Sequence, residues 1–266
     1  MSLAEVAEEL GVHYMTAYRY VRLGLLEAHQ EGRSWVVTTD ALAAFRDGSD
    51  KGTPRQSADW SERLTSRLLA GDEAGAWSVI EAAQASGTDV TDIYLKLITP
   101  AMRDIGERWH RGEIDVAAEH IASRITDRIV GRLGPRANRR GVRRGTVVIG
   151  STATELHALP VSIAADLLRH AQFKVLDLGV NLPPEQFARA VERTDSVMAV
   201  AVGVTTRGQD DQIKRTIEEI KQVTDRPVIV GGSGIDAASA TELGADAYAA
   251  TATDAVALLE DFLSAS

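Results

Sequence analysis

Histidines are the residues with which this chain could bind a transition metal, because the sequence contains no cysteine. One of them, His157, follows the carboxylate of Glu155 by two residues. A neutral imidazole binds borderline metals, and a carboxylate that accepts the proton of its other ring nitrogen fixes the tautomer and raises the ligand's basicity. From this pattern alone, a solvated loop histidine beside a helix-capping acid is the alternative. The six histidines are His13, His29, His110, His120, His157 and His170.

The Glu155–His157 pair follows the first strand of an alternating pattern over residues 146–266. The pattern predicts strands at 146–150, 173–179, 196–203, 227–232 and 246–250, and helices at 160–171, 184–193, 209–223, 236–243 and 253–264. Five such units predict a doubly wound, parallel, Rossmann-like sheet. In the flavodoxin-like order 2-1-3-4-5, ligand loops flank the switch point between strands 1 and 3, here residues 151–159 and 204–209. No glycine-rich phosphate loop follows strand 1, which argues against dinucleotide and P-loop sites.

The segment 57–134 is helical throughout in its pattern. Helices are predicted at 60–70, 73–86, 90–111 and 115–133, with caps at Asp72 and Asp89 and a kink or break at Pro100. Four helices with short connections predict a bundle. Polar linkers are predicted at 47–58 and at 134–145, where there are five arginines and no acid. The predicted domains are therefore 1–50, 57–134 and 145–266.

The first fifty residues predict a small winged helix-turn-helix. A capping box at Ser2 and Glu5 begins one helix, Gly11 ends it, and a second helix runs from His13 to Leu23. A hairpin with its turn at 30–32 and a helix capped at Thr39 or Asp40 complete the pattern. The side chains expected to contact DNA are Tyr18, Arg19, Arg22 and Arg33.

The charge of this segment is acidic, with four arginines against eight acidic residues in 1–50. Small DNA-binding domains usually act as a homo-oligomer, a dimer or tetramer, that places recognition helices one DNA turn apart, and the acidic charge of this segment fits that need. A docking domain without DNA contact is the alternative. The whole chain of 266 residues is also acidic, with 29 basic and 38 acidic side chains, a net charge of −9. It contains neither a basic signal segment nor a run of about 18 apolar residues, so we expect a cytoplasmic protein with no membrane partner.

The histidine loop resembles the DxHxxG motif of B12-binding domains, in which the histidine is the lower axial ligand of cobalt. Here Glu155 replaces the Asp and Pro160 replaces the Gly. After the third strand the family has Ser-x-Leu; Thr205 keeps the hydroxyl, whereas Arg207 departs from the pattern. A double glycine matches the place where the cobalamin nucleotide tail runs close to the backbone. The resemblance implies cobalamin-binding roles for Glu155, His157, Thr205, Gly231 and Gly232, with cobalt bound by His157.

The helical segment adds a second resemblance. Nine residues separate Trp109 from the pair Glu119 and His120, and this W-x9-EH spacing resembles the cap of adenosylcobalamin-dependent photoreceptor regulators, the CarH/LitR group. That likeness implies that Trp109 covers the adenosyl side of the corrin and that Glu119 and His120 close the upper pocket. It also implies that His110 binds cobalt after photolysis.

The N-terminal segment likewise resembles MerR-type regulators and their excisionase-like relatives, on the sequence SLAEVAEELGVHYMTAYRYVRLGLL. Together these likenesses imply a transcriptional regulator, not an enzyme, that binds adenosylcobalamin and operator DNA. Light would break the cobalt–carbon bond and change the oligomeric state and the DNA affinity.

Two other functions remain open from the sequence. A corrinoid methyl carrier of a methyltransferase system would share the second and third segments but would not need the N-terminal one. A light sensor with a bilin such as biliverdin, together with cobalamin, would use Arg207 to pair with a propionate.

Overall fold

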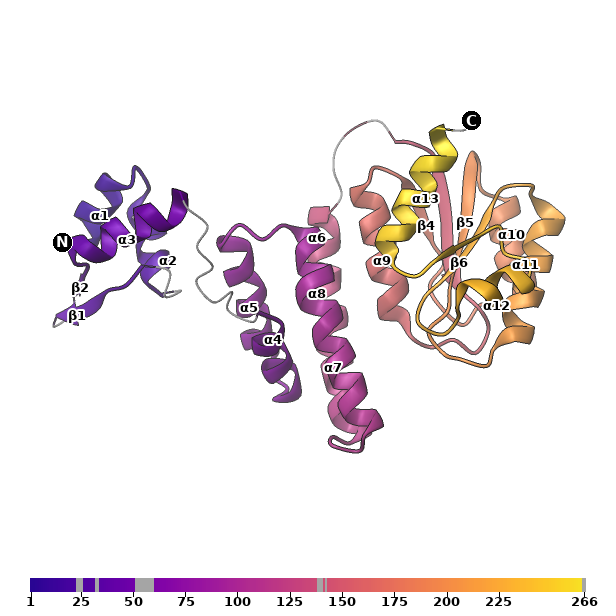
Figure 1. Ribbon diagram of the computed structural model, residues 1–266, viewed down its shortest axis with the longest axis horizontal. Helices are drawn as coiled ribbons and strands as arrows, with labels where there is room; N and C mark the ends of the chain where they lie inside the picture. Colours follow the sequence, from indigo (N-terminus) through magenta and orange to yellow (C-terminus); the bar gives the residue numbers. More distant parts are fainter. Residues whose placement is uncertain (23–25, 32–33, 51–59, 138–140, 142, 265–266) are drawn as a thin grey trace. The chain divides into compact units, whose positions relative to one another are not determined.

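The computed structural model describes residues 1–266 except 23–25, 32–33, 51–59, 138–140, 142 and 265–266. The chain separates into two compact units, Met1–Trp60 and Ser61–Ser266, which are described separately (Figure 1). Arg33, which was predicted to contact DNA, lies outside the described residues, and so does most of the first predicted linker. The side chains of Arg19 and Arg22 also lie outside the described part of the structure. The division into three domains stays a prediction.

The first unit is the predicted winged helix-turn-helix. Its elements are α1 (Leu3–Glu9), α2 (Tyr14–Arg22), the antiparallel hairpin β1 (His29–Glu31) and β2 (Ser34–Val36), and α3 (Thr39–Asp50). The capping box is confirmed, because the Ser2 hydroxyl accepts from the Glu5 amide and the Glu5 carboxylate accepts from the Ser2 amide. Buried Val6, Ala17 and Leu42 hold the helices together.

Two local predictions in this unit were wrong. Gln30 and Glu31 lie in strand β1 instead of in a turn, because they pair with Trp35 and Ser34 across the hairpin. The residue that caps α3 is Thr38, whose hydroxyl accepts from the backbone N–H of Ala41. Caps lie one residue before the helix, so the predicted cap was late by one position.

The second unit begins with the predicted helical segment. Its helices are α4 (Trp60–Leu69), α5 (Glu73–Ala85), α6 (Val90–Asp92), the π-helical turn η1 (Ile93–Ile98), α7 (Thr99–His110) and α8 (Val116–Ala137). Asp72 and Asp89 cap α5 and α6 as predicted. A break near Pro100 was predicted, and the structure has the π-helical turn η1 directly before α7. Pro100 itself lies in the first turn of α7, where a helix does not need the backbone N–H that proline lacks.

Helix α8 continues to Ala137, through Gly134 and Pro135, so the predicted start of the second linker at 134 was wrong. The reason is packing against α9 (Ala158–His170), beside which α8 lies in Figure 1. A Cβ at Gly134 would lie 2.9 Å from Oδ2 of Asp166 on α9, so glycine permits the close approach of the two helices. Tertiary contact thus overrides two local helix breakers.

The sheet has the predicted flavodoxin-like order. Its strands are β3 (Thr146–Ser151), β4 (Lys174–Asp177), β5 (Val197–Gly203), β6 (Val228–Gly231) and β7 (Ala247–Ala249), all paired in parallel in the spatial order β4-β3-β5-β6-β7. One face packs on α9 and α13 (Ala252–Ser264). The other face packs on α10 (Pro184–Glu192), α11 (Asp210–Val223) and α12 (Ala237–Glu242). The carboxyl ends of β3 and β5 therefore lie side by side at the switch point.

No helix among the described residues is long and apolar enough to cross a membrane.

Candidate functional site

The central pair of the site is Glu155 and His157, in the loop between β3 and α9. Oε1 of Glu155 lies 2.6 Å from Nδ1 of His157. The Glu155 side chain is fully buried, whereas the imidazole is 58% exposed. An ionised carboxylate only accepts hydrogen bonds, so Nδ1 carries the proton and Nε2 keeps its lone pair. The exposed imidazole can therefore act as a metal ligand through Nε2.

The neighbouring loop after β5 anchors the Glu155 carboxylate. Oε2 accepts from the backbone N–H of Thr205 at 2.8 Å and of Thr206 at 2.7 Å, and Oε1 accepts from the His157 amide at 3.0 Å. Burial alone would raise the pKa of Glu155, but these hydrogen bonds together hold its pKa below the ordinary value. The carboxylate is therefore ionised at neutral pH and fixed from two loops.

Thr206 was missed by the sequence prediction, which assigned the hydroxyl of this loop to Thr205. The structure places Oγ1 of Thr206 3.3 Å from both Glu155 Oε1 and His157 Nδ1, whereas Thr205 contributes its backbone N–H. The sequence carries no signal that distinguishes two adjacent threonines, because the choice depends on how the loop turns.

The double glycine lies at the end of β6. A Cβ at Gly231 would lie 2.2 Å from the carbonyl oxygen of Ala249, and one at Gly232, where φ is +122°, would lie 2.2 Å from that of Val204. The chain's own backbone therefore requires glycine at both positions, independently of any ligand.

The charge of Arg207 lies near Asp236. The pKa of Asp236 is lowered, first by the backbone N–H of Ser239 and to a smaller extent by Arg207. A propionate bound by this arginine would therefore share it with a carboxylate of the protein.

The residues implied for an upper pocket gather at one end of the α7–α8 helix pair. Trp109, 46% exposed, and the exposed His110 end α7, while Glu119 and His120 lie in the first turns of α8. Glu119 accepts a hydrogen bond of 2.6 Å from the Ser123 hydroxyl. His120 is 73% exposed, with Nε2 3.7 Å from the Glu119 carboxylate.

Large apolar side chains are exposed near both groups. Val116 and Ile121 lie on the first turns of α8, and Leu156, 71% exposed, lies between Glu155 and His157. An exposed apolar side chain beside a potential metal ligand, as Leu156 is beside His157, fits a large, partly apolar ligand that covers it when it binds. The donor set and these surfaces together fit a metal-containing macrocycle.

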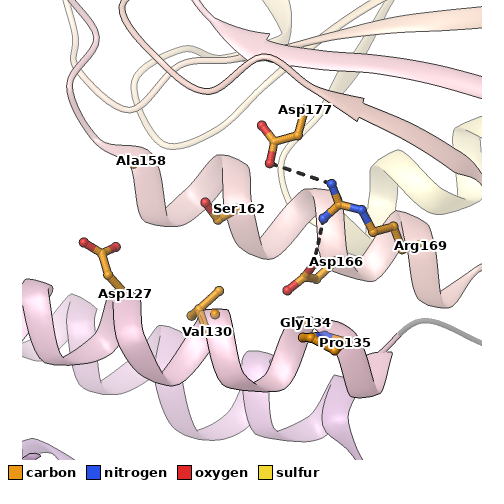
Figure 2. A pocket seen from close by; sticks show the side chains of 10 residues that line it. Asp127, Val130, Gly134, Pro135, Ala158, Ser162, Asp166, Arg169 and Asp177 are labelled. Carbon is orange, nitrogen blue, oxygen red and sulfur yellow. Dashed lines mark hydrogen bonds and ion pairs between the residues drawn. The ribbon is translucent and has the colours of Figure 1, made fainter.

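A cavity of about 580 Å³ lies between α8 and α9 (Figure 2). It adjoins the histidine loop, because Ala158 directly follows His157. Burial raises the pKa of Asp127 on its α8 side. On its α9 side, Arg169 pairs with Asp166 at 2.8 Å. The cavity is lined by Asp127, Val130, Gly131, Gly134, Pro135, Ala158, Ser162, Asp166, Arg169 and Asp177.

The side chains predicted to contact DNA are only partly described. Tyr18 is half-buried and packs against the core of the first unit. Among the side chains of α2 that the structure describes, the exposed large apolar ones are Tyr14 and Met15, at the start of the helix. DNA contact by Tyr18, Arg19, Arg22 and Arg33 stays a prediction.

The fold and the site define an α/β protein with a helical module and a carboxylate-oriented histidine at the switch point of its sheet. Models of the B12 binding domain match residues 60–133 and 145–260, and a helix-turn-helix domain model matches 1–49. The trimethylamine corrinoid protein of Methanosarcina barkeri is 30% identical over 193 residues, which cover 70% of this chain and 88% of that protein. Dimethylamine corrinoid protein 3 of Methanosarcina acetivorans is 28% identical over 191 residues, covering 70% and 89%.

Among solved structures, the Methanosarcina barkeri monomethylamine corrinoid protein has the same fold, with a TM-score of 0.67 and 20% identity over 76% of this chain and 98% of that one. The chain belongs to the family of B12-binding corrinoid proteins. It is a cobalamin-binding protein with a helix-turn-helix unit. The Glu155–His157 geometry fits that cofactor, because it presents one oriented, exposed nitrogen donor.

Proposed function

We propose that the protein is a transcriptional regulator without enzymatic activity that senses light through adenosylcobalamin. The observation that carries this proposal is the presence, in one chain, of a helix-turn-helix unit over 1–49 and of corrinoid-binding modules. The light response in this proposal rests on the W-x9-EH residues, which are Trp109, Glu119 and His120 at the exposed end of α7 and α8.

In this proposal the two ends of the site have different tasks. Glu155 holds the tautomer in which Nε2 of His157 would be available to bind cobalt. Trp109, Glu119 and His120 would hold the adenosyl group of the cofactor. The bound adenosyl form supplies a cobalt–carbon bond that light breaks. His110 would be the nitrogen donor available once the adenosyl group is lost, and its movement would shift the α7–α8 pair and change the contacts between subunits.

A second candidate is a corrinoid methyl carrier. The names of the relatives, trimethylamine and dimethylamine corrinoid proteins, favour this candidate more directly than the first. The helix-turn-helix unit would then dock the carrier onto another protein. Both candidates share His157 as the cobalt ligand, and they differ in what the first unit binds.

The deciding experiment measures DNA binding and light response together. The protein is loaded with adenosylcobalamin in the dark and used to select sites from a random DNA library. Absorption, particle size and affinity for the selected DNA are then recorded before and after illumination.

A regulator selects a sequence, and its size and affinity change with light. A carrier selects no sequence, and after photolysis its corrinoid, reduced to Co(I) by an added chemical reductant, displaces iodide from methyl iodide and becomes methyl-Co(III). Addition of biliverdin, with absorption in the red, tests the bilin alternative.

The selected DNA also tests the recognition helix. Arg22 lies on α2, and Arg22→Ala should weaken binding by at least ~1 kcal/mol if it makes a charge-assisted contact. The measurement is a fluorescence anisotropy titration at fixed salt concentration. Unchanged affinity would remove Arg22 from the interface.

A further inference from the structure

The histidine loop contains a non-glycine residue in the left-handed region. Thr154, directly before Glu155, has a φ of +74°. A β-branched residue adopts this conformation at a cost, so surrounding contacts must hold it there. Four described non-glycine residues have positive φ: Thr154, Gln172, Asn181 and Ser196. Gln172 and Ser196 precede strands β4 and β5, at the opposite edge of the sheet.

The contacts that hold Thr154 come from the loop that follows β4. Backbone bonds join the two loops, from the Ser151 amide to the Gly179 carbonyl at 2.9 Å and from the Leu182 amide to the Ser151 carbonyl at 3.3 Å. Beyond this ladder, Oδ1 of Asn181 accepts from the backbone N–H of Thr154 at 2.9 Å. Asn181 itself has a φ of +59°, a conformation that asparagine tolerates better than most residues.

We infer that Asn181 is a positioning residue for the cobalt ligand. Its side chain holds Thr154 in the left-handed conformation, and this turn delivers Glu155 into its buried position and His157 to the surface. The bond joins two loops 27 residues apart, so the loop after β4 contributes to the ligand geometry. The inference rests on the proposed role of His157, which both candidate functions share.

The test uses the whole protein with histidine labelled by ¹⁵N, loaded with cobalamin and reduced to the Co(II) form. The electron paramagnetic resonance spectrum then shows a two-line splitting if a protein histidine binds cobalt and a three-line splitting if the cofactor's own unlabelled base does. Asn181→Gly keeps the backbone freedom and removes the acceptor. We expect the ratio of histidine-bound to unbound cobalt to fall about five-fold, the size of one lost hydrogen bond. Asn181→Asp, which keeps the acceptor, should retain the wild-type ratio.

A second readout needs no cofactor. In the cofactor-free protein, hydrogen exchange of the Thr154 amide should become about five-fold faster in Asn181→Gly. Ser196→Gly is the matched control, because it removes a side chain at positive φ at the far edge of the sheet. It should leave the spectrum and the Thr154 exchange rate unchanged.

The outcomes separate the inference from the proposed function. A wild-type protein with the two-line splitting, together with an Asn181→Gly variant of the same ratio, overturns the role of Asn181 and leaves His157 as the ligand. A wild-type protein without that splitting overturns both, and faster Thr154 exchange in the variant would then show that Asn181 supports the loop for another purpose. A thermal unfolding midpoint close to wild type excludes misfolding as the cause.

Discussion

The two groups of residues assigned to cobalamin differ in how firmly the protein fixes their side chains before any ligand binds. At the sheet edge, the Glu155 carboxylate is buried and receives hydrogen bonds from three backbone amides, so the His157 ring is oriented in advance. At the end of α7 and α8, Trp109 and His120 are exposed, and the contacts of Glu119 are with its own helix.

The difference assigns different energetic roles to the two ends. A preorganised ligand loses little conformational entropy on binding, so in the proposed site the sheet edge would supply affinity and geometry. Exposed side chains on a helix end are ordered only when a ligand covers them, so their state depends on what occupies the site. A sensor needs such an end, because only differential contacts between two states can shift an equilibrium.

The helical segment is joined to α9 of the sheet domain at a point away from that exposed end. The Tyr94 hydroxyl donates to Asp166 Oδ2 at 2.7 Å, and Arg169 donates to Oδ1 of the same carboxylate at 2.8 Å. Burial and the Asp166 carboxylate raise the pKa of Tyr94, so the phenol stays protonated as the donor. Gly134 lies against the same carboxylate. The helices are therefore fixed to α9 at this point, while the residues at the other end of α8 are exposed.

The largest expected effect is that of removing the preorganised ligand. His157→Ala should abolish the protein-derived nitrogen splitting completely and weaken cobalamin retention, because no other donor occupies the loop position. His110→Ala and His120→Ala should keep this splitting in the Co(II) form. The measurement is the same isotope-labelled resonance spectrum, with retention after gel filtration. A variant of His157 with the wild-type spectrum would reverse the assignment of the two ends.

Glu155→Gln should have the next largest effect. An amide cannot accept hydrogen bonds at both of its terminal atoms, so at least one N–H donor is left unpaired in a buried site. We expect about ten-fold weaker cobalamin binding and a loss of about 1–3 kcal/mol in the free energy of unfolding. Equilibrium titration with cobalamin and denaturant unfolding of the cofactor-free protein check the two numbers.

The pH dependence of this variant follows from the pKa of Glu155. The folded-state pKa is lowered, so the carboxylate contributes stability above its ordinary pKa near 4.5 and loses it as pH falls through the folded value. The difference in unfolding free energy between wild type and Glu155→Gln should therefore be constant near neutrality and shrink below about pH 4.5. A difference that grows on acidification would contradict the ionised, buried carboxylate.

Gly134→Ala tests the fixed junction. A Cβ there would lie 2.9 Å from Asp166 Oδ2, so α8 must shift away from α9. We expect a loss of about 1–3 kcal/mol, typical of an overpacked contact. The matched control is Gly131→Ala, one turn earlier on α8, where nothing lies within 4 Å of the added methyl group. This control should be neutral or stabilising by up to about 1 kcal/mol, because alanine is the better helix former. Equal changes in unfolding free energy for the two variants would contradict a close contact that fixes α8 to α9 at Gly134.

The sequence predicted what depends on short-range periodicity. Alternating apolar strands and helices predicted the sheet order, and the pattern of the first fifty residues predicted the winged unit. The pair Glu155–His157 was found because its two members are only two residues apart along the chain. Thr206 and Asn181 were not found, since their contacts join loops that are 51 and 27 residues apart along the chain. The extension of α8 was missed for the same reason, because its contact with Asp166 is visible only after folding.

The smallest effect on the cofactor-free protein should come from His110→Ala at the exposed end. The side chain is exposed, so the unfolding free energy should change by less than about 0.5 kcal/mol.

If His110 is the residue that binds after illumination, the variant should keep the dark spectrum of the loaded protein. The lit spectrum should lose the second nitrogen ligand, and recovery in the dark should be faster. His120→Ala is the comparison, since it lies on the other helix of the pair and should alter the dark pocket first. A His110→Ala protein with the lit spectrum of the wild type would assign capture to another residue. An illuminated wild type with unchanged spectrum and size would remove the light response and leave the methyl carrier as the better account.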